Sequence, residues 1–249
     1  MEYNGLFFEE HESGDGLALA GCAPGTVRLH VPARVEGVPV IAIADEAFMG
    51  NTELIEVTVE EPDEEMWFEL LTFREIGESA FRDCSSLRRI TVPANDVSIR
   101  HGAFADCGKL AAARIGTSVS LGGYAFYGCT SLTELPLLYY VGEGALQGCT
   151  SLSEVAFDVC AHEIDEDGFR GSGVTEIVFP ETLSHIGQCA FRSCTSLRRA
   201  VFTDPDGWYF ESAYGSGRRP LTLTDPERNA ESLRTVDFDD GVLWWRKQK

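Results

Sequence analysis

The sequence predicts a strand-rich α/β solenoid, and three observations support this fold class. A phrase of about 22 residues recurs seven times, each copy carries an apolar anchor at the same phase, and each copy closes on alternating apolar residues. A fixed period of this length indicates a solenoid in which each coil covers the apolar face of its neighbour. The alternation predicts one short strand per coil, so we expect one parallel sheet with neighbouring strands about 4.8 Å apart.

The seven copies align on one anchor residue each. The copies span residues 43–59, 76–92, 99–115, 121–137, 141–157, 164–179 and 186–202. Their anchors are Phe48, Phe81, Phe104, Phe126, Leu146, Phe169 and Phe191. The step from Phe48 to Phe81 is longer than every later step between anchors, so an insertion is expected after the first copy. Burial of each aromatic anchor is expected to contribute about 1.5–3 kcal/mol.

The copy LGGYAFYGCTSLTELPL shows the expected elements in chain order. GYAF predicts one tight helical or 3₁₀ turn that places Phe126 in the core. GCTS turns the chain back, and Leu132, Leu135 and Leu137 then lead into a strand. Each coil is therefore expected to consist of a turn, a reversal and a strand.

The shared phrase I-G-x-x-A-F-x-x-C-x-S-L-x-x-I-x-V resembles the BspA-type leucine-rich repeat, a bacterial branch of the leucine-rich repeat solenoids. The resemblance covers residues 43–202, and residues 17–48 resemble the lead-in coil of that family. It implies a right-handed, curved solenoid that recognises partners with its surface and is not a catalyst. Many members of the family are surface or secreted proteins.

Three regions are predicted along the chain. Residues 1–42 are expected to form an N-terminal cap and lead-in coil, residues 43–202 the repeats, and residues 203–249 a C-terminal cap. Asp225-Pro226-Glu227 predicts a short helix from Pro226 to about Leu233, with a capping carboxylate and an acidic first turn. The aromatic residues of this region are interpreted as cap core and not as an aromatic ligand site: Trp208, Tyr209, Phe210, Trp244 and Trp245.

Five of the eight cysteines occupy one phase of the repeat: Cys84, Cys107, Cys129, Cys149 and Cys194. A buried structural thiol explains them, because free cysteine packs as a small apolar residue. The chain has no CxxC pair and no clustered histidines, so neither a metal site nor a cofactor is expected. No nucleophile motif is present, so no catalytic residue is expected. Disulfides between ladder neighbours and an enzyme site on the concave face remain open alternatives.

The outward positions of the predicted strands are the first candidate for partner binding. The residue before each strand's apolar anchor is Glu56, Arg89, Ala112, Glu134, Glu154, Glu176 or Arg199. In a parallel ladder Glu134, Glu154 and Glu176 would stack as an acidic stripe, flanked by Arg89 and Arg199. Such a stripe predicts a partner with a basic or cationic surface, and an ordinary solvated face is the alternative.

The insertion EEPDEEMWFELLTF (60–73) is the second candidate. Its acidic start is followed by an apolar run that includes Trp67 and Phe68. Insertions in repeat proteins often lie on a binding face. The segment is therefore predicted either to contact a partner or to fold back on the coil edge.

The charge balance limits the class of partner. Forty acidic and twenty basic residues give a net charge of −20, which disfavours nucleic acid. No apolar run is long enough to insert in a membrane, and the first residues do not resemble a signal peptide. A cytoplasmic protein-interaction module is expected, with a secreted or cell-surface adhesin as the alternative. The sequence leaves the oligomeric state open.

Overall fold

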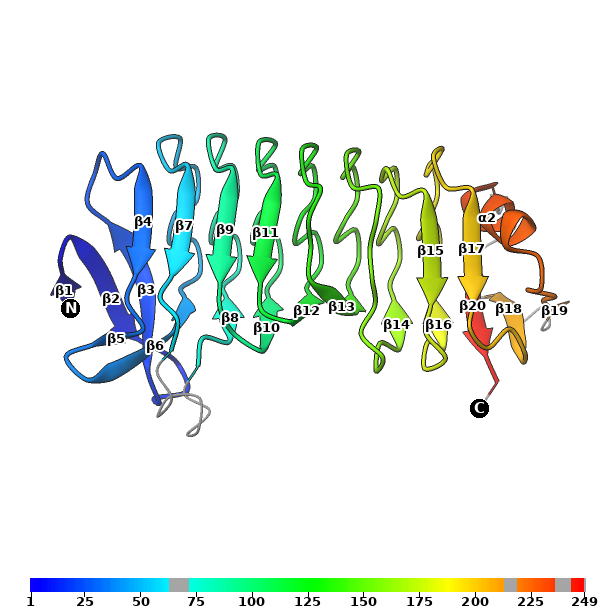
Figure 1. The fold of residues 1–249 in the computed structure, drawn as a ribbon, viewed down its shortest axis with the longest axis horizontal. Coiled ribbons are helices and arrows are strands. Elements are labelled where there is room, and N and C mark those ends of the chain that lie inside the picture. Colours follow the sequence, from blue (N-terminus) through cyan, green and yellow to red (C-terminus); the bar gives the residue numbers. More distant parts are fainter. Residues whose placement is uncertain (63–71, 213–218, 236–242, 249) are drawn as a thin grey trace.

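The computed structural model describes residues 1–62, 72–212, 219–235 and 243–248. These residues form a strand-rich parallel solenoid of about 8 turns. Figure 1 shows the coils side by side in one row, with the chain termini at opposite ends. The predicted fold class is confirmed, and the long axis of the molecule follows the order of the repeats.

The strands expected from the repeat follow the anchor residues, and we call them, together with one strand of the lead-in coil at residues 28–31, the downstream strands. They are β4 (Arg28–Val31), β7 (Glu56–Val59), β9 (Arg89–Val92), β11 (Ala112–Ile115), β15 (Glu176–Phe179) and β17 (Arg199–Phe202). The first four form one parallel sheet and the last two form another. In β7 the apolar Val57 and Val59 are buried, and the alternate residues are half-buried. The alternation of apolar and polar residues in the sequence therefore identifies the apolar residues as the ones that face the core.

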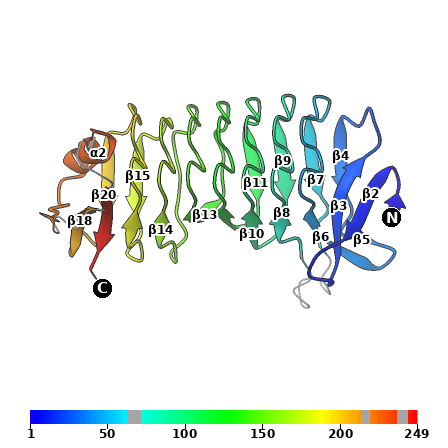
Figure 2. The ribbon, with the colours of Figure 1, turned by 180° about the vertical axis from the view of Figure 1, so that it is seen from behind.

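A second set of strands precedes the anchors, and we call them the upstream strands. They are β3 (Leu17–Cys22), β6 (Val38–Ile43), β8 (Glu75–Ile76), β10 (Asp96–Ile99), β12 (Ser118–Leu121), β13 (Leu137–Val141), β14 (Glu163–Ile164) and β16 (His185–Ile186). They pair in parallel, and Figure 2 shows them from behind along the row of coils. The expectation of one parallel sheet is incomplete, because three of these strands have only two residues and show no alternation.

The downstream ladder is interrupted in the coils anchored by Phe126 and Leu146. The strand predicted at the end of the copy 121–137 is reduced to one bridge between Ala112 and Glu134. Pro136 has no backbone N–H to donate there. The predicted core residue Leu137 is instead 40% exposed and begins β13.

The short spacing between the anchors Phe126 and Leu146 has the same origin. Ser118 and Leu137 are register partners, but the interval from Phe126 to Leu137 is shorter than the interval from Phe104 to Ser118. Tyr139 then adds one residue back, because Val119 pairs with Leu138 and Ser120 pairs with Tyr140. The coil that begins at Phe126 thus has three residues fewer before its upstream strand and one residue more within that strand, as a bulge. The spacing between anchors is therefore two residues shorter than in the preceding coil.

The anchor side chains form a stack through the centre of the solenoid. Ring centroids are 5.2 Å apart for Phe48 and Phe81, 5.2 Å for Phe81 and Phe104, and 5.0 Å for Phe104 and Phe126. Leu146 is fully buried but interrupts the stack, which resumes with Phe169 and Phe191 at 5.0 Å. Burial of these side chains is the main apolar contribution that links one coil to the next.

The turn that carries each anchor is not helical, which corrects the prediction of a helical or 3₁₀ turn. Residues two places before and two places after the anchor have positive φ, as in Ser79 (52°) and Asp83 (60°) around Phe81. The N–H groups of Ser79, Phe81 and Asp83 donate to carbonyls of the next coil, at 2.7–2.9 Å. The intervening N–H groups donate to carbonyls three residues earlier in the same turn, as from Arg82 to Ser79 at 3.1 Å. Every second amide therefore joins two coils.

Glycine in the phrase I-G has a steric reason. A Cβ on Gly187 would lie 2.3 Å from the backbone nitrogen of Glu166, and one on Gly142 would lie 2.7 Å from the carbonyl oxygen of Leu121. Both contacts are shorter than a real Cβ makes. Glycine at this phase therefore allows neighbouring coils to approach closely.

Antiparallel strands cover the N-terminal end. β1 (Glu2–Tyr3) pairs with β2 (Leu6–Glu10), and β2 pairs with β3 before β3 joins β6 in parallel. β5 (Arg34–Val35) adds a short antiparallel pair with β6. Of the insertion 60–73, the structure describes residues 60–62 and 72–73, and Phe73 is buried in the core. Trp67 and Phe68 lie outside the described residues.

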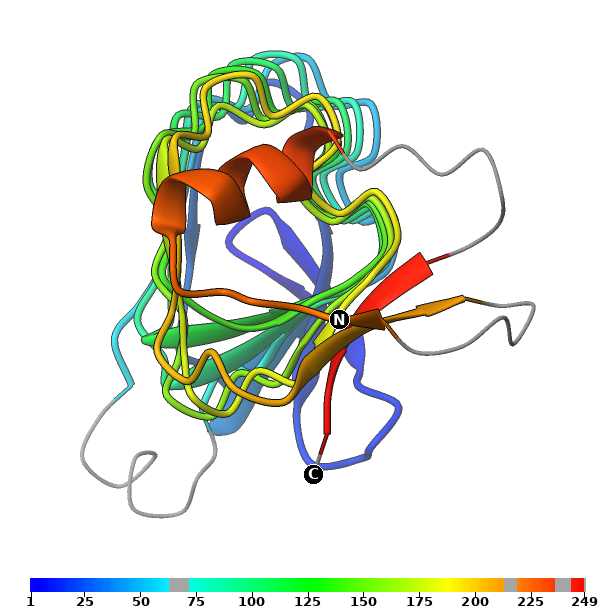
Figure 3. The same cartoon turned by 90° about the vertical axis from the view of Figure 1, so that its right-hand side faces the viewer.

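The C-terminal end is covered by β18 (Trp208–Ser212), β19 (Arg219–Pro220), β20 (Leu243–Lys247) and helix α2 (Pro226–Thr235). Figure 3 shows α2 lying across the end of the row of coils. The Asp225 carboxylate accepts hydrogen bonds from the N–H groups of Glu227 and Arg228, so it caps the helix. Trp208 and Trp245 are buried, and both rings contact Phe202.

The stacked anchors predict a large loss of stability when one is removed. Phe104→Ala should lower the free energy of unfolding by about 3–5 kcal/mol, because a fully buried ring is replaced by a cavity. Met49→Ala is the control, since Met49 follows an anchor but is 49% exposed, and its effect should stay within about 0.5 kcal/mol. Urea unfolding followed by circular dichroism measures both. Similar small effects of the two substitutions would contradict a stacked core.

Candidate functional site

The charged residues predicted as a binding stripe lie on the outward side of the downstream strands. Arg28, Glu56, Arg89 and Ala112 are register partners in consecutive coils, and Glu134 continues the row through its bridge to Ala112. Glu176 and Arg199 are register partners in the second downstream sheet. Glu154 lies between the two sheets, in a coil where the ladder is interrupted.

Ion pairs neutralise most of this row. Glu56 lies 3.6 Å from Arg28 and 3.5 Å from Arg89, between nitrogen and carboxylate oxygen atoms. The corresponding distance is 3.0 Å between Arg114 and Glu134 and 3.3 Å between Arg199 and Glu176. Such exposed pairs contribute at most about 1 kcal/mol each. Charges alternate along Arg28, Glu56 and Arg89, whereas Glu134, Glu154 and Glu176 come from three consecutive coils with no basic residue of the row between them, so the acidic stripe stays a prediction.

A hollow of about 500 Å³ opens where the ladder is interrupted. Glu134 and Glu154 line it together with Leu135, Pro136 and Val155. Glu154 has no ion-pair partner among the described residues, whereas Glu134 shares its carboxylate with Arg114. The hollow therefore combines a carboxylate with no ion-pair partner among the described residues, a second one paired with Arg114, which also lines the hollow, and apolar walls.

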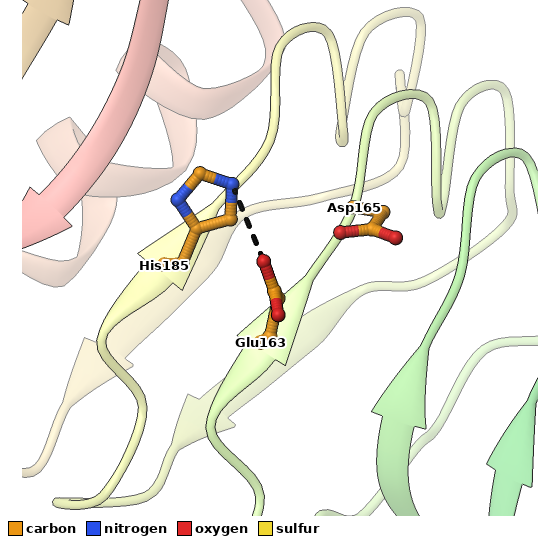
Figure 4. Close-up of side chains that lie close together, drawn as sticks. All are labelled: Glu163, Asp165 and His185. Atoms are coloured by element: carbon orange, nitrogen blue, oxygen red, sulfur yellow. Dashed lines mark ion pairs between the residues drawn. The ribbon is translucent and has the colours of Figure 1, made fainter.

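A second cluster lies on the outward side of the upstream strands, and the sequence did not predict it. Glu163, Asp165 and His185 each offer a metal-ligating atom, and these atoms lie within 4.8 Å of one another. Figure 4 shows the His185 ring directed towards Glu163, with Asp165 beside them. Glu163 and His185 are register partners in β14 and β16. The sequence did hold a signal for this pair, because Glu163 and His185 occupy the same phase of the repeat. Each directly precedes the isoleucine that ends its upstream strand.

Carboxylates dominate the electrostatics around this cluster. The Tyr140 hydroxyl donates to Asp165, and burial together with this carboxylate raises the pKa of Tyr140. The Tyr124 hydroxyl donates to Glu143 at 2.5 Å, which raises the pKa of Tyr124 to about 12. Burial, Asp167 and Glu143 raise the pKa of Glu166. Each shift reflects a surplus of negative charge beside a partly desolvated group.

Burial lowers the pKa of His185, although Glu163 acts in the opposite direction. Arg246 adds to the lowering from the neighbouring strand β20. A lowered pKa leaves the imidazole neutral near pH 7, so one ring nitrogen keeps its lone pair.

The cysteines at the shared phase are fully buried. The Sγ of Cys129 donates to the carbonyl of Phe104 at 3.1 Å, and the Sγ of Cys149 donates to the carbonyl of Phe126 at 3.2 Å. Ser172 occupies the same phase, and its Oγ lies 3.4 Å from the Sγ of Cys194. Burial raises the pKa of Cys149 to about 12, so this thiol stays protonated. The interpretation as structural thiols agrees with this geometry.

Stacked coils of one repeating length, with buried apolar strand faces, define a leucine-rich repeat solenoid. The family model described as BspA type Leucine rich repeat region matches residues 41–158 and 136–205, in 6 copies. The chain belongs to the BspA-type leucine-rich repeat family. Leucine-rich repeat solenoids are generally non-enzymatic and generally bind proteins. A comparison with curated protein sequences finds no significant match.

Two solved structures share the fold. The Leucine Rich Repeat protein of T. pallidum superposes with a TM-score of 0.62 at 22% identity, over 94% of this chain and 95% of that one. A leucine rich cell surface protein of Faecalibacterium prausnitzii superposes with a TM-score of 0.58 at 20% identity, over 86% of this chain and 59% of that one. The chain thus spans just over half the length of the F. prausnitzii structure. Within the described part of the chain, no helix is long and apolar enough to cross a membrane.

The buried ladder predicts which thiols react in the native protein. At about pH 8 iodoacetamide should modify the exposed Cys160 first and the half-buried Cys22 and Cys189 more slowly. The ladder cysteines should react only after unfolding, because they are buried and bonded to carbonyls. Mass spectrometry of peptides from native and urea-unfolded protein measures the difference. Rapid native labelling of Cys129 or Cys149 would contradict the ladder.

Proposed function

We propose that the protein is a non-enzymatic protein-interaction module, and that the outward face of its downstream strands binds a partner with a basic surface. The observation that carries this proposal is the hollow flanked by Glu134 and Glu154. It combines the two features of a binding centre, which are a concave surface and a carboxylate, that of Glu154, with no ion-pair partner among the described residues.

The hollow is a better binding centre than the rest of the row. Glu56 and Glu176 already have arginine partners from neighbouring strands, so an incoming cation would first have to displace them. Glu154 needs no such displacement within the described residues. A lysine or arginine side chain could direct its charged end to Glu154 while its aliphatic part packs on Leu135 and Val155.

The remaining predicted residues would extend the contact. Arg89 and Arg199 lie on either side of Glu134, Glu154 and Glu176 and would favour acidic groups at the edges of the partner's basic surface, because opposite charges attract across an interface. Trp67 and Phe68 stay proposed contacts of the insertion. The net charge of −20 favours a cationic protein over nucleic acid as partner.

A surface-exposed role is the second candidate. The structurally similar protein of Faecalibacterium prausnitzii is described as a cell surface protein. At 20% identity that likeness concerns the fold, so the location is proposed and not inferred from it. Fractionation of the source cells, followed by detection of this chain in the cytoplasmic, surface and secreted fractions, distinguishes an intracellular module from a surface adhesin.

The binding proposal predicts a charge-dependent affinity centred on the hollow. Binding to immobilised short peptides of graded lysine and arginine content should rise with peptide charge, and should weaken as salt screens the interaction. The double variant Glu134→Gln, Glu154→Gln should bind the most basic peptides about tenfold more weakly, which corresponds to about 1.4 kcal/mol.

The matched control changes the same net charge elsewhere in the row. Glu56→Gln with Glu176→Gln should leave peptide binding nearly unchanged, because both carboxylates lie outside the hollow and are paired with arginine. If the Glu134 and Glu154 variant bound as tightly as the wild type, or if both double variants weakened binding equally, the hollow would not be the binding centre.

A further inference from the structure

Three side chains from adjacent coils converge on the outward side of the upstream strands. The Nε2 atom of His185 lies 3.8 Å from Oε1 of Glu163, and with Asp165 the three ligand atoms lie within 4.8 Å of one another (Figure 4). An imidazole nitrogen and carboxylate oxygens are ligand types that zinc accepts in proteins. We propose that Glu163, Asp165 and His185 bind one divalent transition-metal ion of the Zn²⁺ class.

The solenoid itself brings the three groups together. Glu163 and His185 are register partners in the parallel strands β14 and β16, so their side chains emerge side by side. Asp165 follows Ile164, at a phase where the neighbouring copies carry Gly142 and Gly187. All three side chains are half-buried, which reduces the competition of water for the ligand atoms.

Tyr140 supplies the support that a metal ligand needs. It lies one coil earlier, on β13, and its hydroxyl donates to the Asp165 carboxylate. A group that bonds one oxygen of a ligating carboxylate fixes its orientation and leaves the other oxygen for the ion. Tyr140 is therefore the outer partner of the proposed site.

A second histidine–glutamate pair joins His11, which follows β2, to Glu75 on β8, and in this pair an arginine balances the glutamate charge. His11 Nε2 lies 3.7 Å from Oε1 of Glu75, much as in the cluster. There Arg100 approaches the same Glu75 oxygen, with its Nε atom at 3.0 Å, so a guanidinium fills the cation position. The two pairs thus differ in the group beside the glutamate, which is Arg100 for Glu75 and Asp165 for Glu163.

Within the described part of the chain, no such cation lies beside Glu163 and Asp165. Neither carboxylate has an arginine or lysine ion-pair partner among the described residues, and Asp165 is followed by Glu166 and Asp167. Arg246 is the register partner of His185 on the far side of β16, and it pairs with Glu211 at 3.1 Å. The cluster therefore keeps a surplus of negative charge that a divalent cation would balance.

The donor set also selects the class of ion. Ca²⁺ and Mg²⁺ prefer oxygen ligands alone, whereas an imidazole nitrogen favours Zn²⁺ and its transition-metal neighbours. Three protein ligands leave one position of a tetrahedral site for water or for a donor from another molecule. The site lies on the upstream strands, away from the hollow, so a test of metal binding does not depend on whether the hollow binds a partner.

Isothermal titration of the full chain with ZnCl₂, at neutral pH with a non-chelating phosphine reductant, tests the proposal. Wild-type protein should bind one Zn²⁺ per chain, and Mg²⁺ or Ca²⁺ should not compete. Cys160→Ser, which removes the exposed thiol, should bind equally well. Loss of a supporting hydrogen bond typically weakens metal binding by about 10–100-fold, so Tyr140→Phe should fall in this range and His185→Ala at or beyond its upper end.

His11→Ala is the matched control, and it should bind Zn²⁺ as the wild type does, because the His11 and Glu75 pair already has Arg100. Glu163→Gln keeps the shape of the side chain and removes its charge, so it decides the outcome if His185→Ala fails to fold. Saturable binding lost in Glu163→Gln and retained in His11→Ala supports the site. Absence of saturable binding to wild type, or equal binding by wild type and Glu163→Gln, overturns it.

Discussion

Every coil of the solenoid depends on the backbone of its anchor turn, where two left-handed residues flank the buried side chain. A non-glycine residue in this conformation costs about 1–2 kcal/mol, and Ser79, Asp83 and Tyr124 all accept that cost. Interaction between coils offsets it, since from Phe48 to Phe169 the amides of each anchor and of the residues two places before and after it donate to the next coil. The ladder thiols complete the arrangement by donating to the anchor carbonyls of the preceding coil. The backbone polar groups of the turn are thus hydrogen-bonded, so the turn can be buried without loss of hydrogen bonds. Burial of successive turns brings the anchor rings into one stack.

The anchor turns and the anchor stack are the same in most coils. The outward surface therefore differs mainly where a coil departs from the repeat. The coil after Phe126 omits residues between its two strands, and Pro136 removes a donor from the downstream ladder. The hollow beside Glu154 lies at this departure. On the upstream strands the variation is chemical, because the position that carries Ser120 in one coil carries Tyr140, Glu163 and His185 in the next three. The hollow and the Glu163, Asp165 and His185 cluster therefore both lie at outward positions of coils whose interior is the stacked core.

The period and the burial of the anchors could be predicted from the sequence, because they depend on apolar residues that recur at one phase. The helix start at Pro226 could also be predicted, since a capping carboxylate and a proline act locally. The left-handed turns were missed, although the second residue after each anchor is always Gly, Asp or Ser. The upstream strands were missed, and in β8, β14 and β16 the reason is their length, because two residues carry no alternation. The alternation of charge around Glu56 depends on Arg28, which lies before the first aligned copy. The proximity of Glu163 and His185 depends on the register of two coils, which only the fold sets.

Native-state hydrogen exchange tests most directly whether the anchor turns hold the coils together. The amides of Phe81, Phe104 and Phe126 donate across coils at 2.7–2.8 Å from buried positions. They should exchange as slowly as the buried amides of the parallel strands, and only through global unfolding. Exchange of these amides as fast as that of the exposed Val159 would show that the turns open independently of the strands, and would contradict the central role given to them.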